Sequence, residues 1–304
     1  MTRVALIAPS STHAGAREIA ARIAQVITLL LVVAALPSCS SGKPGPAGGT
    51  GPTAGSPQLY WANHDDGAIG RANLDGTNVH NKFITGAKQT CGVAVDATHV
   101  YWGDEEVGGV GRANLDGTGV TPDFITSSAP RSTCGVAVDD AHVYWANFDD
   151  SSLGRANLDG TRVDSRFITG AVAPCGVAVD RQHVYWANSL DNKLGRANLD
   201  GSSVNQSFIT GADTPCGVAV DRTYVYWSNE EGTSIGRAKL DGTAVNEHFI
   251  TGANAPCGVA VGGTYVFWAN HGAMTIGRSN FDGTATNQEL ITGLPAPCGV
   301  AVAR

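Results

Sequence analysis

The residues best suited to chemistry lie in six short segments, one in each copy of a repeat that fills the chain after residue 56. An imidazole begins two of these segments, at His64 and His271, and carboxylates dominate most of the others. Imidazoles flanked by carboxylates are able to bind a divalent metal ion, or to act as acid and base in catalysis. The segments are His64-Asp65-Asp66, Glu105-Glu106, Phe148-Asp149-Asp150, Ser189-Leu190-Asp191, Glu230-Glu231 and His271-Gly272.

One tryptophan per copy sets the spacing of these segments. Successive tryptophans are separated by 41, 43, 41, 41 and 41 residues, and the chain has no others. A repeat of this length is typical of a β-propeller blade. The six residues are Trp61, Trp102, Trp145, Trp186, Trp227 and Trp268.

Each copy contains four segments with the composition of β-strands. In sequence order they follow the patterns Cys-Gly-Val-Ala-Val, His-Val-Tyr-Trp, Ile-Gly-Arg-Ala-Asn-Leu and Phe-Ile-Thr, which are short and rich in β-branched and aromatic residues. An Asp-Gly pair such as Asp75-Gly76 separates the third and fourth segments and is typical of a tight hairpin. Four strands per repeat predict an all-β fold, a propeller of four-stranded blades.

The repeat region, residues 57–304, begins and ends within the same blade. Residues 58–61 have the pattern of a second strand, and residues 298–302 have that of a first strand. We therefore predict a six-bladed propeller in which the C-terminal first strand joins the N-terminal second to fourth strands. Such closure removes sheet edges that could pair with other chains, and we expect a monomer.

The loops that follow the second strands and precede the first strands should emerge on one face, and they are where the copies differ. Variable loops on a fixed scaffold are the natural carriers of specificity. We predict a binding face at one mouth of the propeller channel. It consists of His64, Asp65, Asp66, Glu105, Glu106, Phe148, Asp149, Asp150, Asp191, Glu230, Glu231 and His271.

Ring closure also places His64 and His271 on adjacent blades, although they are 207 residues apart in sequence. Both histidines are candidates for catalysis. Together with Glu105 and Glu230 they are candidates for a divalent metal site, the one cofactor that the sequence suggests. A solvated polar loop face with neither role is the alternative interpretation.

Residues repeated in all copies are interpreted as structural. The tryptophans should pack between neighbouring sheets. An arginine such as Arg71 accompanies each turn aspartate, which predicts an ion pair or a hydrogen bond within or between blades. His99, His142 and His183 share a position where other copies carry Tyr224 and Tyr265, so we expect a packing role there.

Six of the seven cysteines start the first strands, one per blade. In a six-fold ring, the distance between neighbouring equivalent atoms equals their distance from the axis. A disulfide needs Cα atoms within about 7 Å, and strands around a channel should lie farther out. We therefore expect unbridged cysteines that do not coordinate zinc and that serve as small buried apolar residues. They are Cys91, Cys134, Cys175, Cys216, Cys257 and Cys298.

A family resemblance rests on the tryptophan motif. Tyr-Trp followed by a small residue and Asn or Asp, as in residues 101–104, 144–147 and 226–229, resembles the YWTD repeat of low-density-lipoprotein-receptor class B propellers. The resemblance spans residues 57–304 and implies a six-bladed extracellular module for binding or structure. Most copies have Ala-Asn where that motif has Thr-Asp. The Ile-Gly-Arg segments, as at residues 69–71, also resemble repeats of the streptogramin lyases, a seven-bladed group.

The first 56 residues are predicted to direct export. Arg17 and Arg22 precede a short apolar stretch over residues 26–36, and residues 36–39 (Leu-Pro-Ser-Cys) resemble a bacterial lipobox. We expect residues 1–38 to be a lipoprotein-type signal peptide and Cys39 to be lipidated. Residues 39–56, rich in Gly, Pro and Ser, are expected to be a flexible tether. Ordinary cleavage or an uncleaved anchor are the alternatives; in the lipidated case the protein belongs to the bacterial cell envelope.

The net charge of the repeat region limits the classes of partner that it can bind. The first 56 residues hold four of the 20 basic and one of the 27 acidic residues, which leaves 16 against 26, a net charge of −10. Such a domain should repel nucleic acid and anionic lipid. The sequence leaves open whether it is an enzyme. It predicts a binding module for a protein, peptide or glycan, with a metal-dependent lyase or lactone hydrolase of the propeller type as the alternative.

Overall fold

A computed structural model describes residues 57–106, 108–127 and 132–303. The predicted signal peptide, the lipidation site at Cys39 and the tether therefore lie outside the described residues. Within the described part of the chain, no helix has the length and apolar character needed to cross a membrane.

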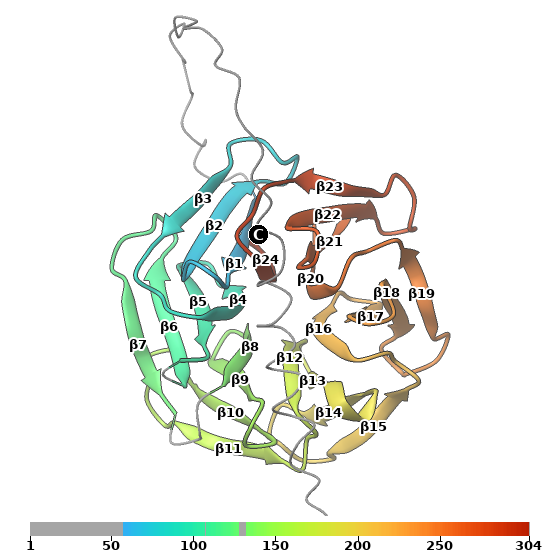
Figure 1. The fold of residues 1–304 in the computed structure, drawn as a ribbon. Coiled ribbons are helices and arrows are strands. Elements are labelled where there is room, and N and C mark those ends of the chain that lie inside the picture. The colour runs from blue at the N-terminus through green and yellow to red at the C-terminus, as the bar shows by residue number, and fades with distance from the viewer. Residues whose placement is uncertain (1–56, 107, 128–131, 304) are drawn as a thin grey trace, which may run out of the picture. The chain divides into compact units, whose positions relative to one another are not determined.

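The described residues form six four-stranded antiparallel sheets arranged in a ring, as predicted (Figure 1). We number these sheets as blades 1 to 6. One short 3-10 turn, η1 (Ser189–Asp191), is present among the strands. Blade 1 contains β24 (Pro297–Ala303), β1 (Gln58–Asn63), β2 (Ala68–Asn73) and β3 (His80–Ile84); blade 2 contains β4 (Thr90–Val95), β5 (His99–Asp104), β6 (Gly109–Asn114) and β7 (Thr121–Thr126); blade 3 contains β8 (Thr133–Val138), β9 (His142–Asn147), β10 (Ser152–Asn157) and β11 (Asp164–Thr169).

The second half of the ring repeats the same order from innermost to outermost strand. Blade 4 contains β12 (Pro174–Val179), β13 (His183–Asn188), β14 (Lys193–Asn198) and β15 (Asn205–Thr210); blade 5 contains β16 (Pro215–Val220), β17 (Tyr224–Asn229), β18 (Ser234–Lys239) and β19 (Asn246–Thr251); blade 6 contains β20 (Pro256–Gly262), β21 (Tyr265–Asn270), β22 (Thr275–Asn280) and β23 (Asn287–Ile291).

Blade 1 closes the ring. β24 pairs antiparallel with β1, with Leu59 opposite Val302 and Trp61 opposite Val300. The first and last described strands are therefore hydrogen-bonded to each other, which confirms the predicted closure. β24 also packs beside both β20 of blade 6 and β4 of blade 2, so the C-terminal strand completes the inner ring as well as its own sheet (Figure 1).

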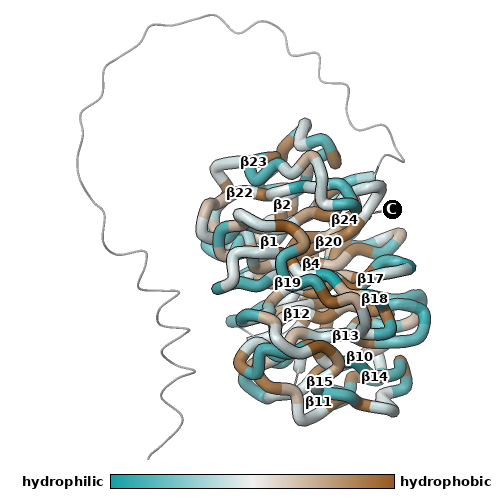
Figure 2. Tube along the Cα trace, turned by 90° about the vertical axis from the view of Figure 1, so that its right-hand side faces the viewer, coloured by the Kyte–Doolittle hydropathy of each residue, from teal (hydrophilic) through white to brown (hydrophobic). Residues whose placement is uncertain are grey.

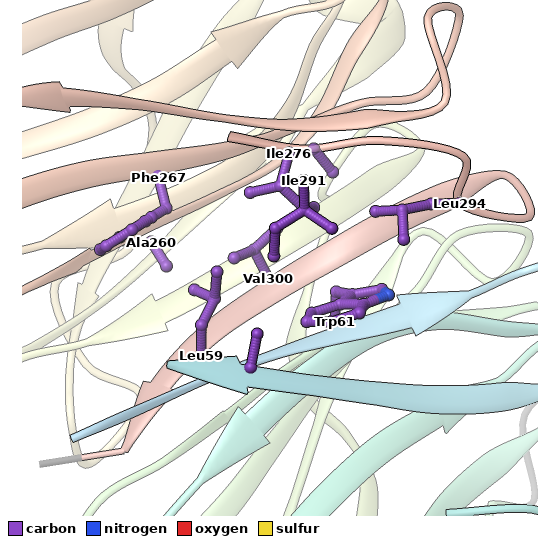
Figure 3. Packing of buried hydrophobic residues seen from close by; sticks show 10 residues of the cluster. Leu59, Trp61, Ala260, Phe267, Ile276, Ile291, Leu294 and Val300 are labelled. Atoms are coloured by element: carbon purple, nitrogen blue, oxygen red, sulfur yellow. The ribbon is translucent and has the colours of Figure 1, made fainter. Parts of the chain in front are cut away.

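The blades are held together by apolar surfaces in which each tryptophan faces the preceding blade. All six tryptophans are fully buried. Trp61 packs with Phe267, Ile276 and Leu294 of blade 6 (Figure 3). In the side view, hydrophobic stretches run through β20 and β24, whereas much of the loop trace is hydrophilic (Figure 2). The predicted packing of tryptophan between sheets is confirmed.

A glycine in the third strand makes room for each tryptophan. Gly195 lies directly opposite Trp186 in the antiparallel pair β13–β14. A Cβ atom at residue 195 would overlap the indole ring of Trp186, and the same holds for the equivalent glycine in every blade. The glycine of the repeated Ile-Gly-Arg segment thus leaves the space that the tryptophan of the neighbouring strand occupies.

In the described part of the chain, five of the six repeated arginines, all except Arg71, donate hydrogen bonds between blades, one of the two forms that the sequence predicts. Nη1 of Arg155 donates to the carbonyl oxygen of Leu199 in blade 4 at 2.8 Å, while its guanidinium lies 3.9 Å from the centre of the Phe167 ring. The turn aspartates have other partners. Asp159 accepts hydrogen bonds from the backbone N–H and the hydroxyl of Thr161, which lower the pKa of its carboxyl group.

The repeated histidine position is a packing position, as expected. His142 is half-buried, and its ring lies 5.9 Å from that of Tyr144 in an edge-on arrangement. Tyr224 occupies the same position in blade 5 and contacts Tyr226 in the same way.

The fit between tryptophan and glycine can be tested with a double-mutant cycle. We expect Gly195→Ala to lower the free energy of unfolding by about 1–3 kcal/mol, because the added methyl group has no free volume. In a Trp186→Phe background the smaller ring frees space, so the same substitution should cost less, with a coupling of at least about 0.5 kcal/mol. Urea unfolding followed by fluorescence measures all four variants. Strictly additive costs would contradict this account of the glycine.

Candidate functional site at the variable face

Six equivalent residues, each directly after a second strand, surround one end of the propeller axis. In every blade the backbone N–H of this residue donates to the carbonyl oxygen of the residue two places before the cysteine, at 3.1–3.3 Å. This bond fixes each residue beside the start of its own innermost strand. We call this set the mouth ring: His64, Glu105, Phe148, Ser189, Glu230 and His271.

One half of the mouth ring contains a histidine–carboxylate pair. Nε2 of His64 lies 3.4 Å from Oε2 of Glu105 on the next blade, and its Nδ1 lies 3.6 Å from the carboxylate of Asp65. The hydrogen bond to Glu105 raises the pKa of His64, and the smaller opposing effect is burial. The pair therefore favours a protonated imidazole facing an ionised carboxylate.

The pKa of His271, on the adjacent blade, is shifted in the opposite direction. Burial lowers the pKa of His271, and the positive charge of His64 lowers it further. Its Nδ1 atom is buried and has no hydrogen-bond partner among the described residues. One face thus holds an imidazole that favours its charged form beside one that favours its neutral form, so the two could act as acid and base.

Glu230 lies across the ring from the histidine–carboxylate pair. Burial raises the pKa of Glu230 to about 7, and the charge of the adjacent Glu231 adds to this effect. Glu231 itself is exposed. The charge on this side of the mouth ring therefore changes near neutral pH.

Phe148 and Ser189 complete the mouth ring with contacts of a different kind. Phe148 packs against the ring of cysteines on the propeller axis. The hydroxyl of Ser189 donates to the carbonyl oxygen of Pro215 on the next blade at 2.6 Å. Ser189 was not among the predicted site residues, although the alignment of the repeats places it at the same position as the histidines and glutamates.

Most of the outer acidic residues of the predicted binding face are paired with basic residues. Lys82 lies 3.2 Å from Asp66, Lys88 lies 3.5 Å from Glu106, and Lys193 lies 2.7 Å from Asp191. Nε of Arg166 donates to Asp150 at 2.9 Å, and Asp149 accepts a hydrogen bond from Ser132.

The inner acidic residues differ from the outer ones. Within the described part of the chain, no Lys or Arg nitrogen lies within 4.0 Å of the carboxylates of Glu105, Glu230 or Glu231. Next to the axis, charge is therefore moderated by the contact of Glu105 with His64 and by the raised pKa of Glu230, and not by a lysine or arginine of the described residues.

The prediction of unbridged cysteines was wrong. Three disulfides join the cysteines of neighbouring blades, with Cα–Cα distances of 5.0–5.1 Å. The pairs are Cys91–Cys134, Cys175–Cys216 and Cys257–Cys298. The expectation that these cysteines do not coordinate zinc rested on the same distance argument, which does not hold because the innermost strands lie closer together than assumed.

The reason is the glycine that follows each cysteine. A Cβ atom on Gly92 would lie 2.6 Å from the carbonyl oxygen of Cys134 and 2.7 Å from the Cα atom of Gly135, so only glycine lets neighbouring strands approach this closely. A register shift occurs at the same place, between Thr90 and Val93 in blade 2. Such a bulge redirects a side chain, and here the cysteines meet around the axis. The repeated Cys-Gly pair is the feature of the sequence that indicates this close contact between neighbouring innermost strands.

The predicted metal ligands are only partly brought together. Among the described residues, two groups of three His, Cys, Asp or Glu side chains have ligand atoms within 4.8 Å of one another. Glu105 belongs to one of them, together with Cys91 and Cys134, and neither group contains His64, His271 or Glu230. The proposed metal role of the histidines stays a prediction.

No protein-family model and no curated protein sequence matches this chain. Solved structures do match. A chain in the crystal structure of a nidogen/laminin complex has a TM-score of 0.71 and 19% identity, covering 82% of this chain and 99% of that chain. Streptogramin B lyase has a TM-score of 0.61 and 17% identity, covering 80% and 83%. A gluconolactonase from Xanthomonas campestris has a TM-score of 0.52 and 20% identity, covering 64% and 73%.

These matches confirm both family resemblances at the level of the fold. The nidogen/laminin match is a YWTD propeller of the low-density-lipoprotein-receptor class B type, and streptogramin lyase propellers match as well. Because the identities lie at 17–20%, the matches establish a common propeller architecture and no shared chemistry.

The raised pKa of Glu230 predicts a pH-dependent stability. The folded chain keeps a proton on Glu230 up to about pH 7, whereas the unfolded chain releases it near 4.5, so stability falls as the pH rises through this interval. Glu230→Gln removes the ionisable group. We expect its melting temperature to exceed that of the wild type by roughly 2–4 °C at pH 8, for a gain of about 1 kcal/mol, and by much less at pH 5.

Glu231→Gln is the matched control, because it removes an equal charge from the exposed neighbour. We expect a smaller gain for this variant at pH 8. Equal gains for Glu230→Gln at pH 5 and pH 8, measured by calorimetry, would contradict the assigned pKa.

Proposed function

We propose that this protein is a binding module whose mouth ring and surrounding loops receive a positively charged segment of a protein or peptide partner. One observation carries the proposal. Six geometrically equivalent positions hold six side chains of four chemical kinds, imidazole, carboxylate, phenyl and hydroxyl, on a scaffold that is otherwise nearly identical from blade to blade. Variation confined to one face of a repeated scaffold is typical of a recognition surface.

The charge distribution favours a cationic ligand. The repeat region carries 16 basic and 26 acidic residues, a net charge of −10. Glu230 and Glu231 have no Lys or Arg within ion-pair distance among the described residues, so Glu231, and Glu230 above its pKa of about 7, are available to lysine or arginine from a partner. Phe148, half-buried in the mouth ring between Glu105 and Ser189, offers an apolar and aromatic contact for the stem of such a side chain.

We also propose that the domain is exported and held at a bacterial membrane through lipidated Cys39. The support is the arrangement of basic, apolar and lipobox-like segments over residues 17–39. Three disulfides in the domain suit an oxidising compartment outside the cytoplasm. The similarly folded chain of the nidogen/laminin structure is part of a protein complex, which is in keeping with a binding role.

The binding proposal can be tested with a fluorescein-labelled decalysine peptide and its decaglutamate counterpart. Fluorescence anisotropy of the full-length chain at low salt should detect decalysine binding and no decaglutamate binding. At pH 8, where Glu230 is ionised, we expect Glu230→Gln/Glu231→Gln to weaken decalysine binding roughly fivefold, because two attractive charges of about 0.5 kcal/mol each are lost.

The control variant Asp123→Asn/Asp140→Asn removes the same charge from exposed sites away from the mouth ring. Asp123 lies in the outermost strand β7, and Asp140 lies in a loop at the opposite face, between β8 and β9. We expect its affinity for decalysine to stay within about twofold of the wild type. Equal weakening by both double variants would show binding to net charge alone and would refute the proposed face.

A second candidate function is that of a metal-dependent lyase or lactone hydrolase. The specific observation in its favour is the pair of imidazoles with opposed pKa shifts, His64 bonded to Glu105 and His271 with a buried, unpartnered Nδ1. Streptogramin B lyase and a gluconolactonase have similar propeller folds.

Metal binding discriminates between the two candidates. If the enzyme proposal holds, added Zn²⁺, Mn²⁺ or Ca²⁺ should raise the melting temperature of the oxidised full-length chain by at least about 2 °C, as expected from linkage between binding and folding. His271→Ala should abolish this shift. His248→Ala, at an exposed residue of the outer strand β19, is the matched control and should retain it. The absence of any shift in the wild type removes the basis of this candidate.

A further inference from the structure

The six sulfur atoms of the blade cysteines form a closed ring around the propeller axis. Three pairs are disulfides, as described above. The remaining neighbours are close as well: Sγ of Cys91 lies 3.3 Å from that of Cys298, and the distances are 3.5 Å for Cys134–Cys175 and 3.6 Å for Cys216–Cys257. Every cysteine therefore has a sulfur neighbour on both sides.

We propose that this ring, once its disulfides are reduced, is a thiolate site for a soft metal ion, and that Cu(I) is the ion that fits it best. The site is distinct from the loop surface of the proposed function, since it lies on the innermost strands. It would give the propeller a metal-bound state that depends on redox conditions.

The sulfur separations match three-coordinate binding. With metal–sulfur bonds of about 2.3 Å, a trigonal site requires sulfur–sulfur distances of about 4.0 Å. The sulfurs of Cys91, Cys257 and Cys298 all lie within 4.8 Å of one another, and the shortest unbonded distance among them is 3.3 Å. The required separation lies between these limits for the unbonded pairs, which need shifts of less than 1 Å. Cys257 and Cys298 are bonded to each other, so their sulfurs have to move apart to this separation once the disulfide is reduced.

The surroundings favour a soft ion over a hard one. The cysteines are 5–9% exposed and form an apolar cluster with Phe148 packed against it. Soft thiolate ligands in an apolar setting select Cu(I), whereas Ca²⁺ and Mg²⁺ require oxygen ligands. Among the described residues, the carboxylate of Glu105 lies within 4.8 Å of the sulfurs of Cys91 and Cys134, and it does not belong to the trio of Cys91, Cys257 and Cys298.

The chemistry balances with an external dithiol as the reductant. Each disulfide accepts two electrons and two protons and becomes two thiols, while the dithiol is oxidised to its own disulfide. Three thiols then lose their protons and bind one Cu(I) ion, which keeps its oxidation state throughout. Reoxidation by three equivalents of an external disulfide, each of which accepts two electrons and two protons and becomes a dithiol, restores the three disulfides of the ring, removes the ligands and releases the ion.

The test uses the full-length chain carrying Cys39→Ser, so that the ring supplies every remaining thiol. The chain is reduced without oxygen by a water-soluble phosphine and titrated with Cu(I) in competition with bicinchoninate. We expect the reduced chain to take at least one Cu(I) ion from the chelator and the oxidised chain to take none. Intrinsic fluorescence of the six buried tryptophans should stay unshifted, showing that the propeller remains folded.

Paired variants locate the site within the ring. Cys91→Ser/Cys175→Ser/Cys257→Ser leaves no two neighbouring thiols in the ring and should weaken Cu(I) binding at least about tenfold. Cys134→Ser/Cys175→Ser/Cys216→Ser removes the same number of thiols but keeps the adjacent trio of Cys91, Cys257 and Cys298, and its affinity should stay within about threefold.

Several results would overturn the proposal. They are equal losses in the two variants, a reduced chain that unfolds, and a reduced chain that binds Zn²⁺ in preference to Cu(I). Decalysine binding is measured on the oxidised chain, and Cu(I) binding on the reduced chain. A negative result in one experiment therefore does not refute the proposal that the other experiment tests.

Discussion

The packing of one tryptophan per blade against the preceding blade is the interaction on which the rest of the structure depends. A four-stranded sheet has two faces and cannot bury both alone, so each blade is stabilised by its neighbours. Trp186 illustrates the fit: its indole lies over Gly195 in its own blade and packs with Tyr144, Leu153 and Ile168 of the blade before it. Arginine hydrogen bonds such as Arg155 to Leu199 join the same neighbours near the periphery.

This packing has a consequence at the centre of the molecule. Six equal blades that meet without a gap force their innermost strands together, and the Cys-Gly pairs allow that approach because glycine has no side chain. The cysteines are then close enough for three disulfides. The axis is lined by sulfur, with the variable residues of the mouth ring at one end of the innermost strands.

Electrostatics divide the variable face into two zones. At its outer edge, acidic residues such as Asp66 and Asp191 are paired with lysines, and exposed pairs of this kind contribute little to stability or to attraction of a partner. Next to the axis, Glu105 is bonded to His64, and burial keeps Glu230 partly protonated near neutral pH. In the mouth ring, hydrogen bonding and burial therefore determine which side chains carry a charge.

The sequence by itself determined the blade count, the four strands per blade and the structural role of the tryptophans, because the same pattern occurs six times. The closure through β24 was determined by the sequence as well, because the repeat region begins with a second strand and ends with a first strand. It also placed His64 and His271 on adjacent blades, since closure follows from the order of the strands. Only the tertiary structure decided the rest. The radius of the inner ring fixed the disulfides. The hydrogen bond to Glu105 raised the pKa of His64, whereas burial lowered that of His271 and raised that of Glu230. Distances across a ring and the depth of a side chain depend on how blades pack together, and no single repeat contains that information.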